Sequence, residues 1–238
     1  MLPTGEVIQS VFKIRSVRAE GTAFAITFDS RQYLVTAAHV LFDDAARPTP
    51  GSLFCLDVFF AQAWTELQCR VVGCGVDPYD IAVLAPPQIL ANYPTVQLGT
   101  SSIAYGQDVY FFGFPYSMHG HIGATNNHYP LPFVKRAIVS MLNFREPYDQ
   151  LLVLDGHNNS GFSGGPVIFQ TWGITPGEWR IAAVISSYSS VRTPVIDAAT
   201  DKETGAYIEE NTGLIEACPI DIGLNLIRAN PIGIPMQT

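Results

Sequence analysis

Short apolar runs separated by turn-forming residues recur along most of the chain. In the first forty residues, apolar and polar positions partly alternate within these runs. Such alternation is typical of strands with one buried face. We therefore expect strands at Val7–Ile14, Thr22–Phe28 and Tyr33–Thr36, with a turn before the third strand and His39 just beyond its end.

The same pattern continues through the rest of the chain with one interruption. Further strand-like runs cover residues 53–60, 66–72, 81–84, 107–115, 133–143, 150–154, 166–171 and 179–186. Pro86 and Pro87 end one run, because proline lacks the N–H that a strand interior needs. The stretch from Pro86 to Thr100 reads as a connector. The pattern predicts an all-β chain in two parts, 1–95 and 96–238.

Three segments depart from the strand pattern. Near the C-terminus, apolar residues at helical spacing follow Asp221, whose carboxylate complements a helix dipole, so we expect one helix from Ile220 to Ala229. The stretch from Tyr116 to Pro132 is a long loop, a kind that is often functional or mobile. The stretch from Ser189 to Asn211 is polar and mostly acidic, and we expect it to be a solvated excursion.

Composition narrows the class of protein. An apolar fraction of 47% with 14% charged residues indicates a folded globular chain. The net charge of -8 argues against a nucleic-acid partner, because such proteins carry a basic surface. No signal peptide and no membrane-spanning segment is recognised, so the sequence as written predicts a cytoplasmic protein without a membrane partner.

The cysteines indicate neither a disulfide framework nor a zinc site. Their number is low for a disulfide-stapled domain, and their spacing does not match zinc motifs. We expect reduced, mostly buried thiols at Cys55, Cys69, Cys74 and Cys218.

The stretch from Ser160 to Pro166 is the strongest candidate for chemistry. Glycines at 161, 164 and 165 allow a sharp turn that exposes the Ser163 hydroxyl and lets nearby N–H groups converge. That arrangement suits a nucleophile beside an oxyanion hole. Ordinary surface turns have the same composition, so the interpretation depends on a base and an acid elsewhere.

His39 and Asp80 supply the missing types. His39 follows one strand-like run and Asp80 precedes another. With Ser163 they give the order His, Asp, Ser along the chain, at separations of 41 and 83 residues. This is the chain order of a chymotrypsin-type triad. Asp77 competes for the acid role, but its neighbour Pro78 indicates a turn, whereas Asp80 directly heads an apolar strand.

The other histidines are expected to be loop residues rather than ligands. No cysteine or carboxylate cluster shares their spacing, so no metal is expected. They are His119, His121, His128 and His157.

Together these motifs resemble the trypsin-like serine peptidases, most closely the Deg/HtrA-type protease domain without a PDZ domain. Supporting segments match that branch along nearly the whole chain. They are Gly21-Thr22-Ala23-Phe24, Leu98-Gly99-Thr100-Ser101, Gly106-Gln107-Asp108, Gly113-Phe114-Pro115, Ala137-Ile138-Val139-Ser140, Asp155 and Ala217-Cys218-Pro219. The resemblance implies a chymotrypsin-like fold of two six-stranded antiparallel β-barrels with a short C-terminal helix, the active site lying in the cleft between the barrels.

The resemblance also implies roles for individual residues. Ser163 would be the nucleophile of a serine endopeptidase, His39 its general base, and Asp80 the group that orients the imidazole. The N–H groups of Gly161 and Ser163 would form the oxyanion hole. A protein or peptide would be the substrate, and no cofactor is implied.

The primary specificity pocket follows from the same resemblance. His157 and Asn158 would form its base, Ser160 would lie beside them, and Ser186, Ser187 and Tyr188 would form its wall. No carboxylate stands at the base, so a preference for Arg or Lys is not expected.

Departures from the family limit the comparison. Phe162 stands where Asn or Asp is usual, no Ile-Val-Gly-Gly-like start is present, and no PDZ domain is expected beyond Thr238. Two other functions remain open: a non-catalytic peptide-binding module on the same fold, and an esterase-type hydrolase with the same triad. A further hypothesis is that the segments Tyr116–Pro132 and Ser189–Asn211 flank the cleft and hold it inactive until substrate orders them.

Overall fold

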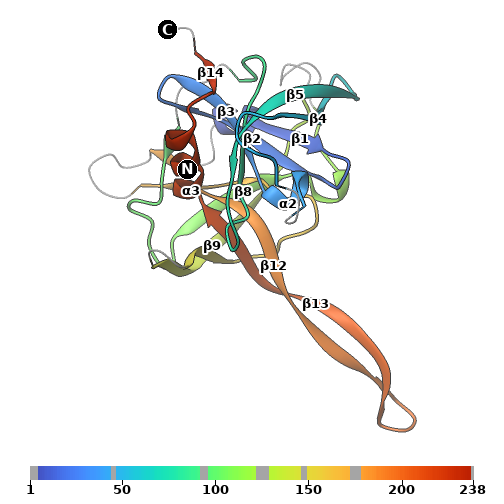
Figure 1. Cartoon of the computed structure of the whole chain (residues 1–238). Helices are drawn as coiled ribbons and strands as arrows, with labels where there is room; N and C mark the ends of the chain where they lie inside the picture. The colour runs from blue at the N-terminus through green and yellow to red at the C-terminus, as the bar shows by residue number, and fades with distance from the viewer. Residues whose placement is uncertain are drawn as a thin grey trace.

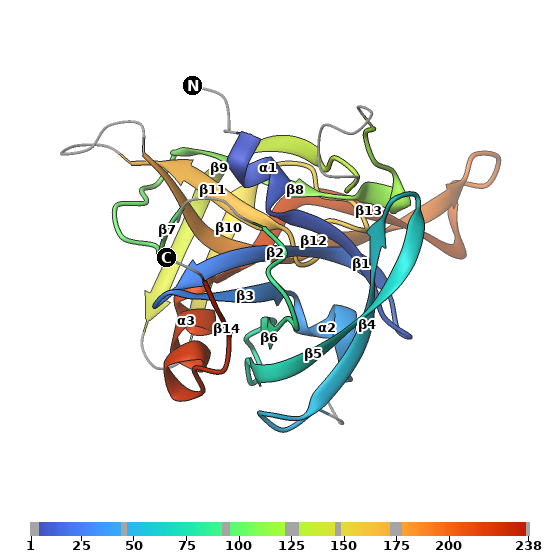
Figure 2. The ribbon, with the colours of Figure 1, turned by 90° about the horizontal axis from the view of Figure 1, so that it is seen from above.

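The computed structural model describes residues 5–43, 47–91, 96–121, 129–145, 149–171 and 178–236. Most of these residues lie in the strands of two sheets, as the sequence pattern predicts. Seen from above, the blue and cyan strands of the first sheet lie beside the green, yellow and orange strands of the second (Figure 2). The predicted all-β fold is confirmed.

The first sheet closes into a six-stranded antiparallel barrel. The order is β3-β2-β1-β4-β5-β6, and β3 also pairs with β6 to complete the ring, while β14 adds to the start of β3. The strands are β1 (Val11–Arg15), β2 (Glu20–Phe28), β3 (Arg31–Thr36), β4 (Leu53–Phe60), β5 (Ala63–Cys74), β6 (Ala82–Ala85) and β14 (Ile234–Pro235). An apolar cluster around Phe12, Leu34 and Leu56 fills its interior.

The second sheet also closes. Its order is β11-β8-β9-β10-β13-β12, pairing of β11 with β12 completes the ring, and β7 adds a short parallel pair to β12. The strands are β7 (Gln97–Leu98), β8 (Asp108–Gly113), β9 (Phe133–Arg145), β10 (Asp149–Asp155), β11 (Pro166–Gln170), β12 (Trp179–Asp197) and β13 (Lys202–Pro219). Phe111, Phe162 and Phe169 lie in its core.

A third apolar cluster joins the barrels. It includes Val83 of the first barrel, Ile168 and Val184 of the second, and Leu224 of helix α3 (Ile220–Ala229). The helix has the bounds that the sequence predicts, which confirms that expectation. The division of the chain into 1–95 and 96–238 stays a prediction, because residues 92–95 lie outside the described ranges. β14 returns the end of the chain to the first sheet.

The stretch from Ser189 to Asn211 forms a long antiparallel hairpin, the outer part of β12 and β13, which we call the arm. It projects away from both barrels (Figure 1). Its hydroxyl side chains donate across to glutamates, from Ser190 to Glu209 and from Thr193 to Glu210. Both faces of the arm lie in solvent, so its residues show no alternation of apolar and polar positions.

Two other segments bear on the predicted strands and loops. The expected strand Val7–Ile14 is divided into helix α1 (Gly5–Gln9) and β1, because both the N–H and the hydroxyl of Ser10 donate to the Val7 carbonyl and close a turn there. Within the predicted loop from Tyr116 to Pro132, residues 122–128 lie outside the described residues. The rest contains the short 3-10 helix η2 (Pro115–Ser117) and a bridge between Gly120 and Leu131.

All four cysteines are free thiols, as expected. Cys69 and Cys218 are buried, Cys74 is partly buried and Cys55 is exposed. Burial raises the pKa of Cys69 to about 12 and that of Cys74 to about 11. Across the described residues, no helix is both long and apolar enough to cross a bilayer.

A buried amide fastens the connector to the first barrel. The Gln32 side chain is 1% exposed; it donates to the Ala91 carbonyl at 2.6 Å and accepts from the N–H groups of Leu90 and Ala91. Gln32→Leu would leave these backbone groups without partners. We expect a loss of about 2 kcal/mol in the free energy of unfolding, measured by urea denaturation. Gln68→Leu is the matched control, because Gln68 is exposed; equal effects of the two changes would contradict this role for Gln32.

Candidate active site

The loop that carries Ser163 is pinned between the barrels by a close backbone approach. Gly164 has φ +86°, and a Cβ at this position would lie 2.0 Å from the Thr22 carbonyl oxygen. The N–H of Thr22, on β2, donates to the Ser163 carbonyl at 2.9 Å. Only glycine allows this combination of conformation and proximity, so the loop presents Ser163 at the contact between the barrels.

Neighbouring segments hold the carbonyl groups of the loop. The N–H of Tyr116 donates to the Ser160 carbonyl at 2.9 Å, and the Thr22 hydroxyl donates to the Gly161 carbonyl at 2.7 Å. Because a trans peptide directs its C=O and N–H to opposite sides, the Gly161 N–H points away from Tyr116. Within the described part of the chain, the N–H groups of Gly161 and Ser163 have no acceptor. Two donors therefore remain unpaired in the loop that carries Ser163.

Phe162, the unusual residue of this loop, points inward. Its side chain is fully buried and meets the Phe111 ring edge-on, with ring centroids 5.0 Å apart. On β9, Lys135 places its ammonium 5.2 Å from the Phe162 ring centroid and donates to the His157 carbonyl and to Asn159 Oδ1. Phe162 thus anchors the loop in the core of the second barrel, where a polar residue would need a partner.

The first barrel brings His39 and Asp80 together. His39 lies in the one-turn helix α2 (Ala38–Leu41) directly after β3, and Asp80 lies shortly before β6, which pairs with β3. The carboxylate of Asp80 accepts from the His39 N–H at 2.9 Å and from His39 Nδ1 at 2.6 Å. Asp77, the competing acid, is exposed.

A third donor to Asp80 comes from the second barrel. The Ser186 hydroxyl donates to the same carboxylate oxygen as His39 Nδ1, at 2.6 Å. Burial by itself would raise the pKa of Asp80, but the hydrogen bonds and electrostatic attraction of His39 and the hydrogen bond of Ser186 outweigh it and hold that pKa below its ordinary value. The carboxylate stays ionised and can orient the imidazole with Nε2 free.

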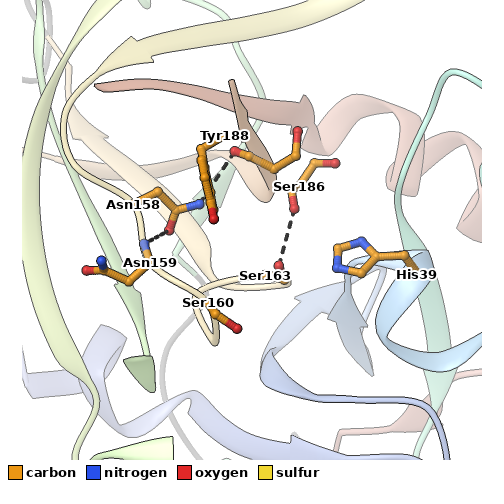
Figure 3. Close-up of a pocket in the computed structure, with 8 residues that line it drawn as sticks. His39, Asn158, Asn159, Ser160, Ser163, Ser186 and Tyr188 are labelled. Carbon is orange, nitrogen blue, oxygen red and sulfur yellow. Dashed lines mark hydrogen bonds between the residues drawn. The ribbon is translucent and has the colours of Figure 1, made fainter. Parts of the chain in front are cut away.

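The Ser163 side chain lies between the His39 imidazole and the segment that carries Asn159 and Ser160 (Figure 3). It donates to the Ser186 carbonyl at 3.3 Å. Among the described contacts there is no hydrogen bond from Ser163 to His39. Rotation about the Cα–Cβ bond of Ser163 would be needed to direct the hydroxyl at the imidazole.

The cavity beside Ser163 has a volume of about 370 Å³. It contains five of the six residues that the sequence assigned to a specificity pocket, together with Asn159, which the sequence analysis missed. The lining residues are His39, Asn158, Asn159, Ser160, Ser163, Ser186, Ser187 and Tyr188. No carboxylate, lysine or arginine lines it among the described residues, so its polar groups are hydroxyls, amides and the His39 imidazole.

His157 lies elsewhere. Its side chain is exposed and does not line the cavity. The hydrogen bond from Lys135 holds the carbonyl of His157 on the outer side of the loop. Asn158 occupies the base instead: it is 2% exposed, its amide donates to the Ser187 carbonyl at 3.4 Å, and its Oδ1 accepts from the Asn159 N–H at 2.8 Å.

The described residues contain no group of three or more side chains able to hold a metal ion. His119 packs its ring against Phe59, and the His121 ring contacts the Gln62 amide. His128 lies outside the described residues. The chemistry that the arrangement supports is nucleophilic attack by a hydroxyl with an acid-oriented imidazole as base, next to two free N–H donors.

Comparisons with known proteins bear on the family and on the fold. A family model described as the trypsin-like peptidase domain matches residues 21–174. No curated protein matches the sequence.

Solved structures show a similar fold. The HtrA-type protease AlgW with tripeptide aligns at a TM-score of 0.54 and 19% identity over 94% of this chain; the chain spans 60% of the length of that AlgW chain. An inactive form of the Rv3671c protease aligns at a TM-score of 0.54 and 19% identity. The alignment covers 94% of this chain and 90% of the Rv3671c chain. A serine-to-alanine mutant of Rv3671c from M. tuberculosis H37Rv aligns at 0.55 and 18% identity, covering 97% and 91%. At these identities the likeness shows the fold.

Removal of the Ser186 hydroxyl tests the electrostatics of Asp80. In Ser186→Ala the carboxylate loses a donor to its ionised form, so we expect its pKa to rise, as read from the carboxyl carbon in an NMR titration. The folded pKa lies below the ordinary value of about 3.9. The Asp80 carboxylate therefore contributes to the free energy of unfolding at pH values above its ordinary pKa. This contribution is lost as the pH falls through its pKa in the folded protein.

Ser190→Ala is the matched control, because its hydroxyl bonds Glu209 on the arm. An Asp80 pKa that is the same in Ser186→Ala and Ser190→Ala would contradict this role for Ser186.

Proposed function

Because the chain belongs to the trypsin-like peptidase family, we propose that it is a serine endopeptidase that cleaves peptide bonds through an acyl-enzyme. The observation that carries the proposal is the Asp80–His39 pair, bonded at 2.6 Å beside a hydroxyl whose loop presents two unpaired N–H groups. The first barrel contributes the base His39, and the second barrel contributes the nucleophile Ser163.

In the acylation step, the Ser163 hydroxyl turns from the Ser186 carbonyl to His39 Nε2. The imidazole takes the hydroxyl proton as Ser163 Oγ attacks the carbonyl carbon of the scissile bond. Asp80 holds the Nδ1–H tautomer and stabilises the imidazolium that forms. The positive charge on His39 is thus paired with the negative charge of Asp80 during the attack.

The negative charge of the tetrahedral intermediate develops on the former carbonyl oxygen. The N–H groups of Gly161 and Ser163 stabilise it; one such donor contributes about 3 kcal/mol in comparable enzymes. The imidazolium gives its proton to the leaving amine as the C–N bond breaks. Water, deprotonated by His39, then attacks the ester, and the imidazolium returns that proton to Ser163 Oγ as the ester bond breaks and the acid product leaves.

The cavity beside Ser163 receives the side chain that precedes the scissile bond. Since its described lining holds amides and hydroxyls and no carboxylate, a trypsin-like preference for Arg or Lys is not proposed. Asn158, with its amide held by Ser187, favours a small or polar side chain that can accept or donate a hydrogen bond.

One observation favours the second candidate, a peptide-binding module without catalysis. The Ser163 hydroxyl is bonded to the Ser186 carbonyl, with no bond to His39 in the described residues. Fluorophosphonate labelling separates the two, because it requires an activated serine. Esterase activity uses the same acyl chemistry and is distinguished by comparing ester and amide substrates.

The nucleophile assignment predicts complete dependence on Ser163. Digestion of casein or a peptide library by Ser163→Ala should fall by about 10⁶-fold, to background, and fluorophosphonate should label the wild-type chain at Ser163 alone, as located by mass spectrometry. Equal proteolysis by the wild type and Ser163→Ala would refute the assignment.

The acid assignment predicts a difference between two nearby aspartates. Asp80→Asn should lower kcat by about 10⁴-fold, because the amide favours the wrong imidazole tautomer. Asp77→Asn, the matched control, should leave kcat close to the wild-type value, since Asp77 is exposed. The measurement is kcat on one cleaved peptide, and the reverse order of effects would assign the acid to Asp77.

A further inference from the structure

One edge of β12 becomes free at the point where Ser163 lies. β11 covers this edge as far as the pair Pro166–Val184, followed by two backbone bonds between Ile185 and residues 164 and 165. The next carbonyl along β12, that of Ser186, accepts the Ser163 hydroxyl. Beyond it, no strand in the described ranges pairs with this edge, because β13 lies on the other side.

The free edge continues from the cavity onto the arm. Ser187 and Tyr188 line the cavity, and β12 runs on without a break to Asp197 in the projecting hairpin (Figure 1). Pro194 has no N–H to donate, and proline is tolerated in strands where its nitrogen faces an open edge. The edge that can pair therefore covers Ser187 to Thr193, about 23 Å at about 3.3 Å per residue.

The direction of a bound peptide follows from β11. A peptide that continues the line of β11 is antiparallel to β12 and runs from the arm toward Ser163. Residues on the N-terminal side of the scissile bond would then lie along the arm. Its main chain would add a strand to the sheet, the mode called β-augmentation.

Side chains beside this edge give it a chemical character. Alternation places Ser187, Ser189, Val191 and Thr193 on one face of β12. Across the strand pair, Glu216 accepts from the hydroxyls of Ser187 and Ser189. Farther out, Glu210 stands opposite Val191 and accepts from Thr193.

Neither glutamate forms an ion pair with a basic side chain of the described residues. Two apolar side chains on the same face are exposed. Val191, opposite Glu210, is 49% exposed, and Ile208, opposite Thr193, is 55% exposed. The face therefore offers carboxylates beside apolar contacts, which complement basic side chains on the matching face of an extended peptide, that is, at every second residue.

We propose that the arm is an extended substrate-binding strand, which pairs with the chain N-terminal to the scissile bond and selects basic residues within it. This inference rests on the proposed function. A second copy of the protein fits the edge less well, because two arms pairing about a two-fold axis would bring like carboxylates together.

Matched peptides test the proposal. A bond that the wild-type chain cleaves in casein supplies a short core peptide, which is extended at its N-terminus by seven residues of alternating Lys and Val, Glu and Val, or Ser and Gly. We expect kcat/KM to be about fivefold higher for the Lys series than for the Glu series at low salt, with the difference falling at high salt. Equal values for the two series would overturn the proposal.

Two variants locate the selection on the arm. Glu210→Gln should reduce the Lys preference to about half, whereas Glu203→Gln, beyond Pro194 near the tip of the arm, should leave it unchanged. The same loss in both variants, or in neither, would refute the assignment to the face that carries Glu210. Size-exclusion chromatography with light scattering, done on the same samples, tests whether a second copy of the protein occupies the arm. A dimer that dissociates when the arm is shortened would show that the arm is a dimer interface and would overturn the proposal.

N-methylation of single peptide amides tests the pairing itself. Methyl groups on amides that face β12 should lower kcat/KM, and those on amides that face solvent should not, which gives a two-residue period. An effect without this period would refute strand addition. Fluorophosphonate labelling of Ser163 is run in parallel: failure to label tests the proposed function, whereas labelling without peptide selectivity refutes only the arm.

Discussion

The carboxylate of Asp80 ties the two barrels together through a charge. It is only 21% exposed, and an ionised group with so little contact with water is costly unless donors replace the water. Two of its donors belong to His39 in the first barrel and one to Ser186 in the second. The ionised state of Asp80 and the docking of the barrels therefore depend on each other, and the orientation of the imidazole depends on both.

The nucleophile loop obtains its shape from its surroundings. Its carbonyl groups are held by donors from Tyr116 and Thr22, and its one large side chain, Phe162, is buried among the aromatic residues of the second barrel. Glycine at 164 allows the approach of β2. With several of its carbonyls and its apolar anchor fixed by neighbouring segments, the loop leaves the N–H groups of Gly161 and Ser163 unpaired among the described residues.

Sequence reasoning works best where burial imposes a pattern. The strands with one face in a core are visible as alternating runs, and Asp80 stands out because it directly precedes such a strand. The arm has no buried face, so its strand pairing leaves no apolar period from Ser189 to Asn211. The pocket depends on loop geometry: Asn158 and Asn159 line the cavity while His157 lies outside, and Lys135 of β9 bonds the loop at His157 and Asn159. Contacts between residues far apart in sequence leave no local signal of this kind.

The pairing of β14 with β3 bears on how the molecule assembles during synthesis. Ile234 lies opposite Gln32, and the Arg31 side chain donates to the Gly233 carbonyl, so these contacts span about two hundred residues of chain. The ribosome must release residues beyond 234 before the first sheet can take its final form. Contacts of such long range slow folding, because the entropy of closing a large loop is lost before the contact is gained. The first barrel to emerge therefore gains its last strand pairing, that of β14 with β3, only after the second barrel and helix α3 have been made.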